Sequence, residues 1–587
     1  MEYDLKIING TIFDGTGSWG YSANLAILNG KIVEIGVCHG SAQKTIDAKD
    51  AIVTPGFIDL HTHYDGQITW DEELRPSVNH GVTTAILGNC GVGFAPVHEA
   101  DHDRLIRLME GVEDIPGTAL AEGLTWNWNH FPEYMNAIDA LPHTINFGVQ
   151  IPHDPVRVFV MGERALAQEK ATEDDIVKMR NIVRAGLEAG AFGFTTGRSD
   201  VHRTADGEWT PASESSLEEL VGIAKAFHRL NHGVLQAVSD FDMERGSDKF
   251  DSEFDIVEAF AQAGGENHPT SISVMQRDFE PGQWLKIIDR VEKANAKGIK
   301  IFMQVAPRAI GVMVGLQCTF HPFMGFPSYK KISHLSLEYR VKKMHDPKFK
   351  TQILQENSER LAVDGTSIPP IVDYFLQQID TVSAKLFELG ENPDYEQPIE
   401  KSILYKGKAA GKSPLESIYD AMLKQDGKAL LYFPIYNYTE FNYDNILKMM
   451  NHPQSLSGLS DGGAHVGTIC DGSFPTYLLS YWTRDRKTGD KIPLKKAIHT
   501  LTKKNADYLG IRDRGELKTG MKADINIIDI ARLKLFSPEM VQDLPAGGQR
   551  LLQRAEGYRA TIVSGEIVIE NDELTGQRPG RLIRMGK

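Results

Sequence analysis

Short apolar runs predict β-strands at both ends of the chain. In the first 55 residues these runs are 4–9, 24–28, 31–36 and 51–54, with an Asn-Gly hairpin signal at Asn29-Gly30. Near the other end, 523–530 and 559–570 repeat the pattern. Neither end has enough apolar surface for a core of its own. We therefore expect residues 1–55 and 511–587 to pair into one small β-sandwich domain.

Between Gly56 and about Gly510 the pattern changes to a strand followed by a helix, repeated along the chain. Apolar runs predict strands at 82–87, 191–195, 234–238, 271–275 and 299–305, and a capping-box sequence at Thr172 opens one of the helices between them. Repeated βα units indicate a parallel sheet. Closed into eight units, they predict an α/β fold, a (β/α)₈ TIM-like barrel over residues 56–510 with its active site at the carboxyl ends of the strands.

Residues 309–450 interrupt this alternation. A helical pattern at 370–386 stands among Pro-rich and aromatic-rich pieces, which include Phe320, Phe323, Phe326, Tyr329 and Tyr432. An insertion of this length on one face of a barrel serves either as a lid over the active site or as an oligomer contact, and the sequence does not choose between them.

Two histidines stand one residue apart where an apolar run ends, in Pro55-Gly56-Phe57-Ile58-Asp59-Leu60-His61-Thr62-His63. In a strand, residues i and i+2 point to the same face, so His61 and His63 project together. Two neutral imidazoles at a strand end form half of a divalent metal site. Two histidines at this spacing, taken alone, are more often surface residues. The preceding Pro-Gly turn and the neighbouring Asp65 favour a metal site here.

Two further candidates follow predicted strands. Cys90 lies in Gly88-Asn89-Cys90-Gly91, and Asp461 is followed by two glycines after an apolar piece. The alternatives are a buried apolar cysteine and an ordinary Asp-Gly turn. Because both residues fall at strand ends of the predicted barrel, we assign His61, His63, Cys90 and Asp461 as ligands of Zn²⁺, although other divalent metals also fit such a set. The carboxylate of Asp461 is also suited to proton transfer.

Net charge and cysteine content limit the expected partners and the expected compartment of the protein. The net charge of −16 argues against nucleic acid and anionic membranes as partners, and four widely spaced cysteines do not form a disulfide framework. No secretory leader and no apolar run of bilayer length is recognisable. We therefore expect a cytoplasmic enzyme acting on a small molecule, and we expect a homo-oligomer.

The motifs around His61, Cys90 and Asp461 resemble those of the amidohydrolase superfamily, and more narrowly its D-aminoacylase (N-acyl-D-amino-acid deacylase) branch. The resemblance covers nearly the whole chain. It implies that metal-activated water attacks an amide carbonyl, with Asp461 as acid and base. We also expect His465, four residues later, to assist catalysis by stabilising the oxyanion.

The chain departs from that branch at the fifth and sixth strands, where the branch has histidine ligands. The corresponding segments, 235–240 and 271–276, contain no histidine. His228, His232 and His268 precede the strands, at the other end of the barrel, and we expect them on the surface. About one catalytic metal per chain is therefore predicted.

The expected substrate site also differs from that of the D-aminoacylase branch, because Asp471 stands where the branch presents an arginine to a substrate carboxylate. We assign Tyr64, Arg308 and Asp471 to substrate binding and expect a preference for amides without a free carboxylate. Arg308 or Arg198 is the alternative carboxylate partner.

Together these features predict a metal-dependent hydrolase of an amide C–N bond, in an N-acyl amide or an N-acyl amino acid. One alternative is a cyclic-amide hydrolase of the dihydropyrimidinase type, although no lysine is placed to be carboxylated after 191–195. The other is a metal-poor, non-catalytic barrel that acts as a binding subunit.

Overall fold

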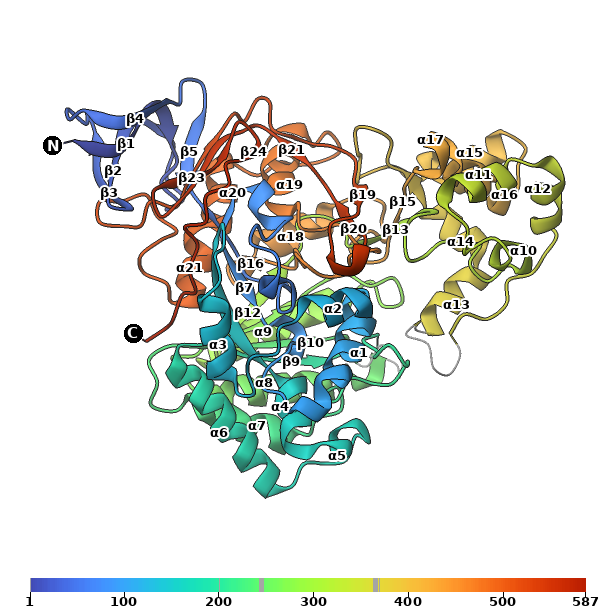
Figure 1. Cartoon of the computed structure of the whole chain (residues 1–587), viewed down its shortest axis with the longest axis horizontal. Helices are drawn as coiled ribbons and strands as arrows, with labels where there is room; N and C mark the ends of the chain where they lie inside the picture. Colours follow the sequence, from blue (N-terminus) through green and yellow to red (C-terminus); the bar gives the residue numbers. More distant parts are fainter. Residues whose placement is uncertain (1, 200, 242–246, 363–367, 369, 587) are drawn as a thin grey trace.

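A computed structural model describes residues 2–199, 201–241, 247–362, 368 and 370–586. Its centre is an eight-stranded parallel sheet whose strands follow one another in chain order. Figure 1 shows the barrel helices packed around these strands. The strands are β6 (Phe57–Asp59), β7 (Val82–Leu87), β8 (Asn146–Pro152), β9 (Gly193–Arg198), β10 (Val234–Ser239), β11 (Thr270–Ser273), β12 (Ile301–Val305) and β16 (Ser455–Ser457). The predicted (β/α)₈ barrel is confirmed.

The barrel closes just beyond the first and last strands. Thr62 and Gly462 form a parallel bridge, and the His63 amide donates to the Gly462 carbonyl at 2.8 Å. The Asp461 amide donates to the His61 carbonyl at 3.1 Å. The backbone that joins the two barrel edges is therefore the backbone that carries both histidines and Asp461.

Helices connect the barrel strands, as the alternating pattern predicts. The Thr172 hydroxyl caps one of them by accepting from the Asp175 amide, so the capping box is formed as expected. The connecting helices are α1 (His102–Glu113), α2 (Gly117–Gly123), α3 (Phe131–Asp139), α4 (His153–Met161), α5 (Glu163–Leu166), α6 (Glu173–Ala189), α7 (Leu217–Ala224), α8 (Phe250–Gly264), α9 (Gln283–Ala296) and α18 (Asp444–Asn451). After β16 come α19 (Phe474–Ser480), α20 (Leu494–Leu501) and α21 (Lys503–Leu509).

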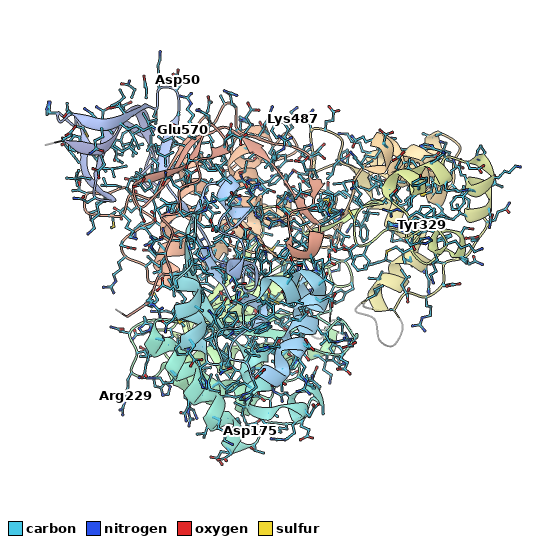
Figure 2. All side chains as sticks on the ribbon, viewed as in Figure 1. Asp50, Asp175, Arg229, Tyr329, Lys487 and Glu570 are labelled. Atoms are coloured by element: carbon cyan, nitrogen blue, oxygen red, sulfur yellow. The ribbon has the colours of Figure 1, made fainter. Side chains whose placement is uncertain are left out.

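Both ends of the chain build one nine-stranded sheet. Its N-terminal strands are β1 (Tyr3–Ile12), β2 (Tyr21–Leu28), β3 (Lys31–Gly36), β4 (Ala42–Asp47) and β5 (Ile52–Pro55), and its C-terminal strands are β17 (Ile525–Ile528), β22 (Tyr558–Val563), β23 (Glu566–Glu570) and β24 (Glu573–Leu574). The pairing of β5 with β17 joins the two halves, and their apolar side chains share one cluster. In Figure 2, Asp50 and Glu570 accordingly lie on the same part of the molecule. The pairing of the two ends follows the expectation, while the exact domain limits stay a prediction.

The predicted turn at Asn29-Gly30 packs against a second turn, Ser564-Gly565, from the other end of the chain. Asn29-Gly30 and Ser564-Gly565 all have positive φ, as a tight hairpin turn requires. A Cβ on Gly30 would lie 2.7 Å from the Ser564 carbonyl oxygen, so glycine is needed for the close approach as well as for the turn.

Two short β-pairs lie between β17 and β22 in the chain. They are β18 (Lys534–Leu535) with β21 (Ala555–Glu556), and β19 (Glu539–Val541) with β20 (Arg550–Leu552).

The insertion forms a lobe beside the barrel, drawn in yellow in Figure 1. A three-stranded sheet of β13 (Gly311–Val314), β15 (Leu431–Pro434) and β14 (Phe387–Glu388) connects the lobe to the barrel. Its helices are α10 (Pro327–Lys330), α11 (Leu337–Met344), α12 (Pro347–Ile353), α13 (Pro370–Gln377), α14 (Ile379–Ala384), α15 (Ile403–Ala409), α16 (Pro414–Met422) and α17 (Lys424–Gly427). The lobe has an apolar cluster of its own, and Tyr329, labelled in Figure 2, belongs to it.

Within the described part of the chain, no helix is both long enough and apolar enough to cross a bilayer.

Candidate metal centre

The predicted ligands meet at one point. The ligand atoms of His61, His63 and Cys90 all lie within 4.8 Å of one another, and all three residues are buried. His61 Nε2 is 3.2 Å from Cys90 Sγ and 3.3 Å from Asp461 Oδ1, and His63 Nε2 is 3.8 Å from the same carboxylate oxygen. Two nitrogens, a sulfur and an oxygen facing one point form a donor set that fits Zn²⁺.

Each of these residues is placed by its local backbone. His61 and His63 follow β6 in extended chain, so both side chains turn to the same side. Cys90 lies directly after β7 with a φ of 55°, and Asp461 follows β16 with a φ of 49°. Left-handed backbone at non-glycine residues costs free energy and is concentrated at functional sites.

The glycines beside Cys90 make this turn possible. Gly88 and Gly91 both have positive φ, and a Cβ on Gly91 would lie 2.7 Å from the Gly197 amide nitrogen. The loop therefore packs directly against the end of β9.

The outer ring nitrogen of each histidine lies beside an oxygen atom of another side chain. His61 Nδ1 lies 2.8 Å from Gln304 Oε1, and His63 Nδ1 lies 3.2 Å from Glu113 Oε1. Acceptors at Nδ1 favour a proton on that nitrogen and leave the Nε2 lone pair for a metal.

Burial shifts the pKa values of the ionisable groups in the site. Burial lowers the pKa of His61 to about 4 and that of His63 well below its ordinary value, so both imidazoles are neutral. Burial raises the pKa of Asp461 to about 7, and it raises the pKa values of Cys90 and Glu113 well above their ordinary values. Two buried acids, Cys90 and Glu113, and the partly buried Asp461 stand beside two neutral imidazoles. A dication would stabilise such a site, since a nearby cation favours the anionic forms of the three acids.

The fifth and sixth strand ends supply other contacts in place of histidine ligands. Gln236 accepts from the Cys90 amide at 3.2 Å, and its amide nitrogen lies 3.1 Å from His61 Nδ1. Gln276 faces away from the cavity and donates to Glu440 at 2.9 Å. Asp240 lines the cavity after β10.

A cavity of about 400 Å³ opens above the cluster and contains all four predicted ligands in its wall. His465 also lines it, and burial lowers the pKa of His465 to about 3. Apolar residues from the insertion form part of the wall, among them Ile310, Phe320, Met324, Ile435 and Tyr436. The insertion therefore contributes to the site, as a lid would. Phe323, Phe326 and Tyr329 pack inside the lobe instead.

Sequence reasoning missed three residues that line this cavity, Glu113, His202 and Arg277. No sequence pattern marked Glu113 or His202 as a site residue, because Glu113 stands at a helix end and His202 in an irregular loop, and only the fold brings them to the cavity. Arg277 had a signal, since it stands four residues after β11 at the carboxyl end of a strand. It is the only lysine or arginine among the described lining residues.

Arg277 is buried; burial lowers the pKa of its guanidinium, while the Asp240 carboxylate acts to raise it. It donates to Gln283 Oε1 at 2.9 Å and to the Ser239 carbonyl at 3.1 Å, while its Nε has no partner in the described structure. A buried guanidinium whose hydrogen bonds go to neutral acceptors, with one nitrogen left over, can bind an anion.

The structure places Tyr64, Arg308 and Asp471 outside the cavity wall, contrary to their expected role in substrate binding. Arg308 and Asp471 lie 3.0 Å apart with fully buried side chains, so each charge has the other as its partner. The Tyr64 hydroxyl lies 2.7 Å from Ser77 Oγ, and its ring lies beneath Gly462 and Gly463. Arg198, the other alternative, pairs with Glu253 at 2.9 Å.

The three histidines before the strands take no part in the site. His228 is exposed, His232 is partly exposed, and each lies 3.0 Å from a backbone carbonyl oxygen. His268 is buried rather than on the surface, because its Nδ1 reaches the Gly233 carbonyl at 3.0 Å between packed elements.

A model of the amidohydrolase family matches residues 44–363 and 422–569. The chain belongs to the amidohydrolase family. The unmatched stretch between the two ranges, 364–421, lies in the middle of the insertion, whose first and last parts are matched.

Curated relatives match the amidohydrolase over its whole length. D-aminoacylase from Alcaligenes xylosoxydans xylosoxydans is 23% identical, with 99% of this chain and 98% of the relative covered. N-acyl-D-aspartate deacylase from the same organism is 24% identical, with 100% and 96% covered. The resemblance inferred from the motifs is confirmed.

Solved structures confirm the fold. A crystal structure of D-aminoacylase matches 99% of this chain and 100% of its own, with a TM-score of 0.64 and 20% identity. N-acyl-D-glutamate deacylase from Bordetella bronchiseptica, in complex with zinc and a phosphonate inhibitor, gives the same score and identity with full coverage of both chains. The protein is accordingly a metal-dependent hydrolase that cleaves an amide C–N bond.

Proposed function

We propose that this amidohydrolase cleaves linear N-acyl amino acids at one catalytic divalent metal, and that Arg277 binds the carboxylate of the substrate. The observation that carries the proposal is a single cavity whose wall holds both the converging metal donors and one buried guanidinium. The names of the relatives, which are deacylases of D-amino acids, support the substrate class.

His61, His63, Asp461 and Cys90 would hold the metal. When bound, the metal supplies Lewis-acid polarisation of a water molecule and of the amide carbonyl. The Asp461 carboxylate then takes a proton from the water and passes it to the leaving nitrogen. His465, on the same wall, is placed to donate to the carbonyl oxygen as negative charge develops on it.

The count of one catalytic ion rests on the fifth and sixth strands. Gln236 lies beneath the histidines, and Gln276 is turned toward Glu440, so neither replaces an imidazole ligand. Three or four protein donors with an open position form a complete site for one ion.

The substrate proposal reverses the expectation of amides without a free carboxylate. That expectation required the charge of Asp471 to face the substrate, but Arg308 neutralises it outside the cavity. The cationic lining residue is Arg277. Of the acidic lining residues, Asp461 and Glu113 lie beside the histidines, where a dication would offset their charge, whereas Asp240 acts on Arg277.

The apolar part of the wall defines the other half of the substrate. Phe320, Met324 and Tyr436 come from the insertion and suit an acyl group rather than a second charge. Hydrophobic acyl chains should therefore be preferred over acetyl.

Comparing kcat/KM for an N-acyl-D-amino acid, its L-enantiomer and its primary carboxamide tests the proposal. We expect the free acid to be hydrolysed faster than the carboxamide. Arg277→Met should lower kcat/KM for the acid by about a hundredfold, because a charge-assisted hydrogen bond contributes about 1.5–3 kcal/mol. The carboxamide should change by less than about threefold.

Lys293→Met is the matched control, since it removes an exposed cation on the outer face of α9. Faster hydrolysis of the carboxamide, or equal losses for acid and carboxamide in the Arg277 variant, would contradict the assignment of Arg277. Turnover of cyclic amides with no turnover of linear ones would contradict the substrate class.

A further inference from the structure

Glu113, the last residue of α1, places its carboxylate between two imidazoles of the site. Oε1 lies 3.2 Å from His63 Nδ1, and Oε2 lies 3.7 Å from His465 Nε2. The Glu113 side chain is 1% exposed and lines the cavity. Among the described residues, neither His63 Nδ1 nor Glu113 Oε2 makes a hydrogen bond, so both contacts are close approaches within ion-pair distance.

The neighbouring Asp114 fixes the end of α1. Its carboxylate accepts from the Gly467 amide at 3.1 Å and from the hydroxyls of Thr319 and Thr468. Thr468 in turn donates its amide to the His465 carbonyl at 2.8 Å. Two adjacent residues therefore contact the loop that carries His465. Asp114 binds the backbone of this loop, and Glu113 lies beside the His465 ring.

The two metal-facing histidines differ in their outer partner. His61 Nδ1 lies against the neutral amide of Gln304, whereas His63 Nδ1 lies against the carboxylate of Glu113. A carboxylate beside Nδ1 keeps the proton there, fixes the ring orientation and raises the basicity of Nε2. His63 Nε2 is the atom that faces Asp461 and the metal position.

We propose that Glu113 is a positioning residue that orients His63 toward the metal and His465 toward the substrate. The inference rests on the proposed function, because it assigns Glu113 a role around the same metal. It concerns a residue whose carboxylate lies beside two imidazoles and acts through them.

Two substitutions of Glu113 separate its two contacts. Glu113→Leu removes both, so the zinc affinity of the folded protein should fall by about 10–100-fold. Glu113→Gln keeps an oxygen beside His63 Nδ1 but removes the negative charge beside His465 Nε2, so the His465 ring loses the contact that orients it. This variant should retain zinc and lose at least about tenfold in kcat with little change in KM.

Zinc affinity is measured by competition with a chelator on metal-stripped protein, and the kinetics are measured at saturating zinc. Asp103→Asn is the matched control, because it removes an exposed carboxylate from the same helix. It should match the wild type in both measurements. Thermal melting of each metal-free variant reports whether the fold is intact.

A folded Glu113→Leu variant with wild-type zinc affinity would overturn the inference. If that variant does not fold, Glu113→Gln decides, and an unchanged kcat overturns the inference. Failure of the wild-type protein to bind zinc would instead count against the proposed function, so the two failures are distinguishable.

Discussion

Arg308 and Asp471 form an ion pair of 3.0 Å between two side chains that solvent does not reach. The guanidinium also donates to the Cys470 carbonyl at 2.6 Å and lies 4.0 Å above the ring of Tyr395, which belongs to the insertion. The pair therefore fastens the loop after β16 to the base of the lobe. Asp471, which the sequence suggested as part of a substrate site, instead helps to attach the insertion to the barrel.

Asp471→Ala should lower the free energy of unfolding by about 3–5 kcal/mol, because it leaves a buried guanidinium without its counter-charge. Chemical denaturation measures the loss. Glu570→Gln, which breaks the exposed pair with Lys44, should cost less than about 1 kcal/mol. A stable Asp471 variant with an altered preference between free acid and carboxamide would return Asp471 to the substrate site.

Asp154 should make stability depend on pH. Its Oδ1 accepts from the Ala212 amide at 2.6 Å, Oδ2 has no partner in the described structure, and burial raises its pKa to about 7. A raised pKa means that the folded state holds the proton more tightly than the unfolded state. The stabilising contribution of protonated Asp154 to the free energy of unfolding is therefore fully present below about pH 4 and is lost as the pH rises through 7.

Asp154→Asn removes this titration, so the fall in stability between pH 4 and pH 8 should shrink by up to about 4 kcal/mol. Denaturation at the two pH values measures it. Asp174→Asn, at a side chain that is 89% exposed, should leave the difference unchanged. An equally steep pH dependence in both variants would show that other groups cause it.

Asp114→Ala should loosen the contact between the insertion and the barrel. The substitution removes the acceptor of two hydroxyls and one amide, which belong to Thr319 on the insertion and to Gly467 and Thr468 after β16. We expect faster hydrogen exchange around Thr319 and a higher KM. Asp206→Asn is the control, since it breaks only an exposed pair with Arg107. Unchanged exchange at Thr319 would contradict the role of this contact.

Elemental analysis should find about one tightly held zinc per chain. His61→Ala, Cys90→Ser and Asp461→Asn should each abolish or strongly reduce turnover while the protein stays folded, because a core of this size does not depend on one metal ion. Circular dichroism checks the fold. Two tightly held ions per chain would mean that residues such as Asp240 or His202 complete a second site.

The sequence predicted the elements whose local pattern is clear. The limits of β3 and β7 match the expected runs 31–36 and 82–87, and strand alternation was sufficient to place His61 beside His63. By contrast, β8 went unrecognised. All seven of its residues are buried although several are polar, so it shows no alternation.

The missed site residues have a common physical cause. Glu113 reaches His63 only because α1 ends above the barrel, and Arg308 meets Asp471 only because two loops pack together. Contacts of this kind depend on how distant elements dock, which no local pattern records. Homo-oligomerisation also stays a prediction.

The insertion separates the choice of substrate from the chemistry. The metal donors follow β6, β7 and β16, whereas Phe320, Met324 and Tyr436 reach the cavity from a lobe that has its own apolar core. The wall that we propose binds the acyl group can therefore change by substitution or exchange within the lobe while the reacting centre stays intact. Such an arrangement lets one barrel acquire new amide substrates at little cost to catalysis, and it makes the lobe the natural target for redesigning acyl specificity.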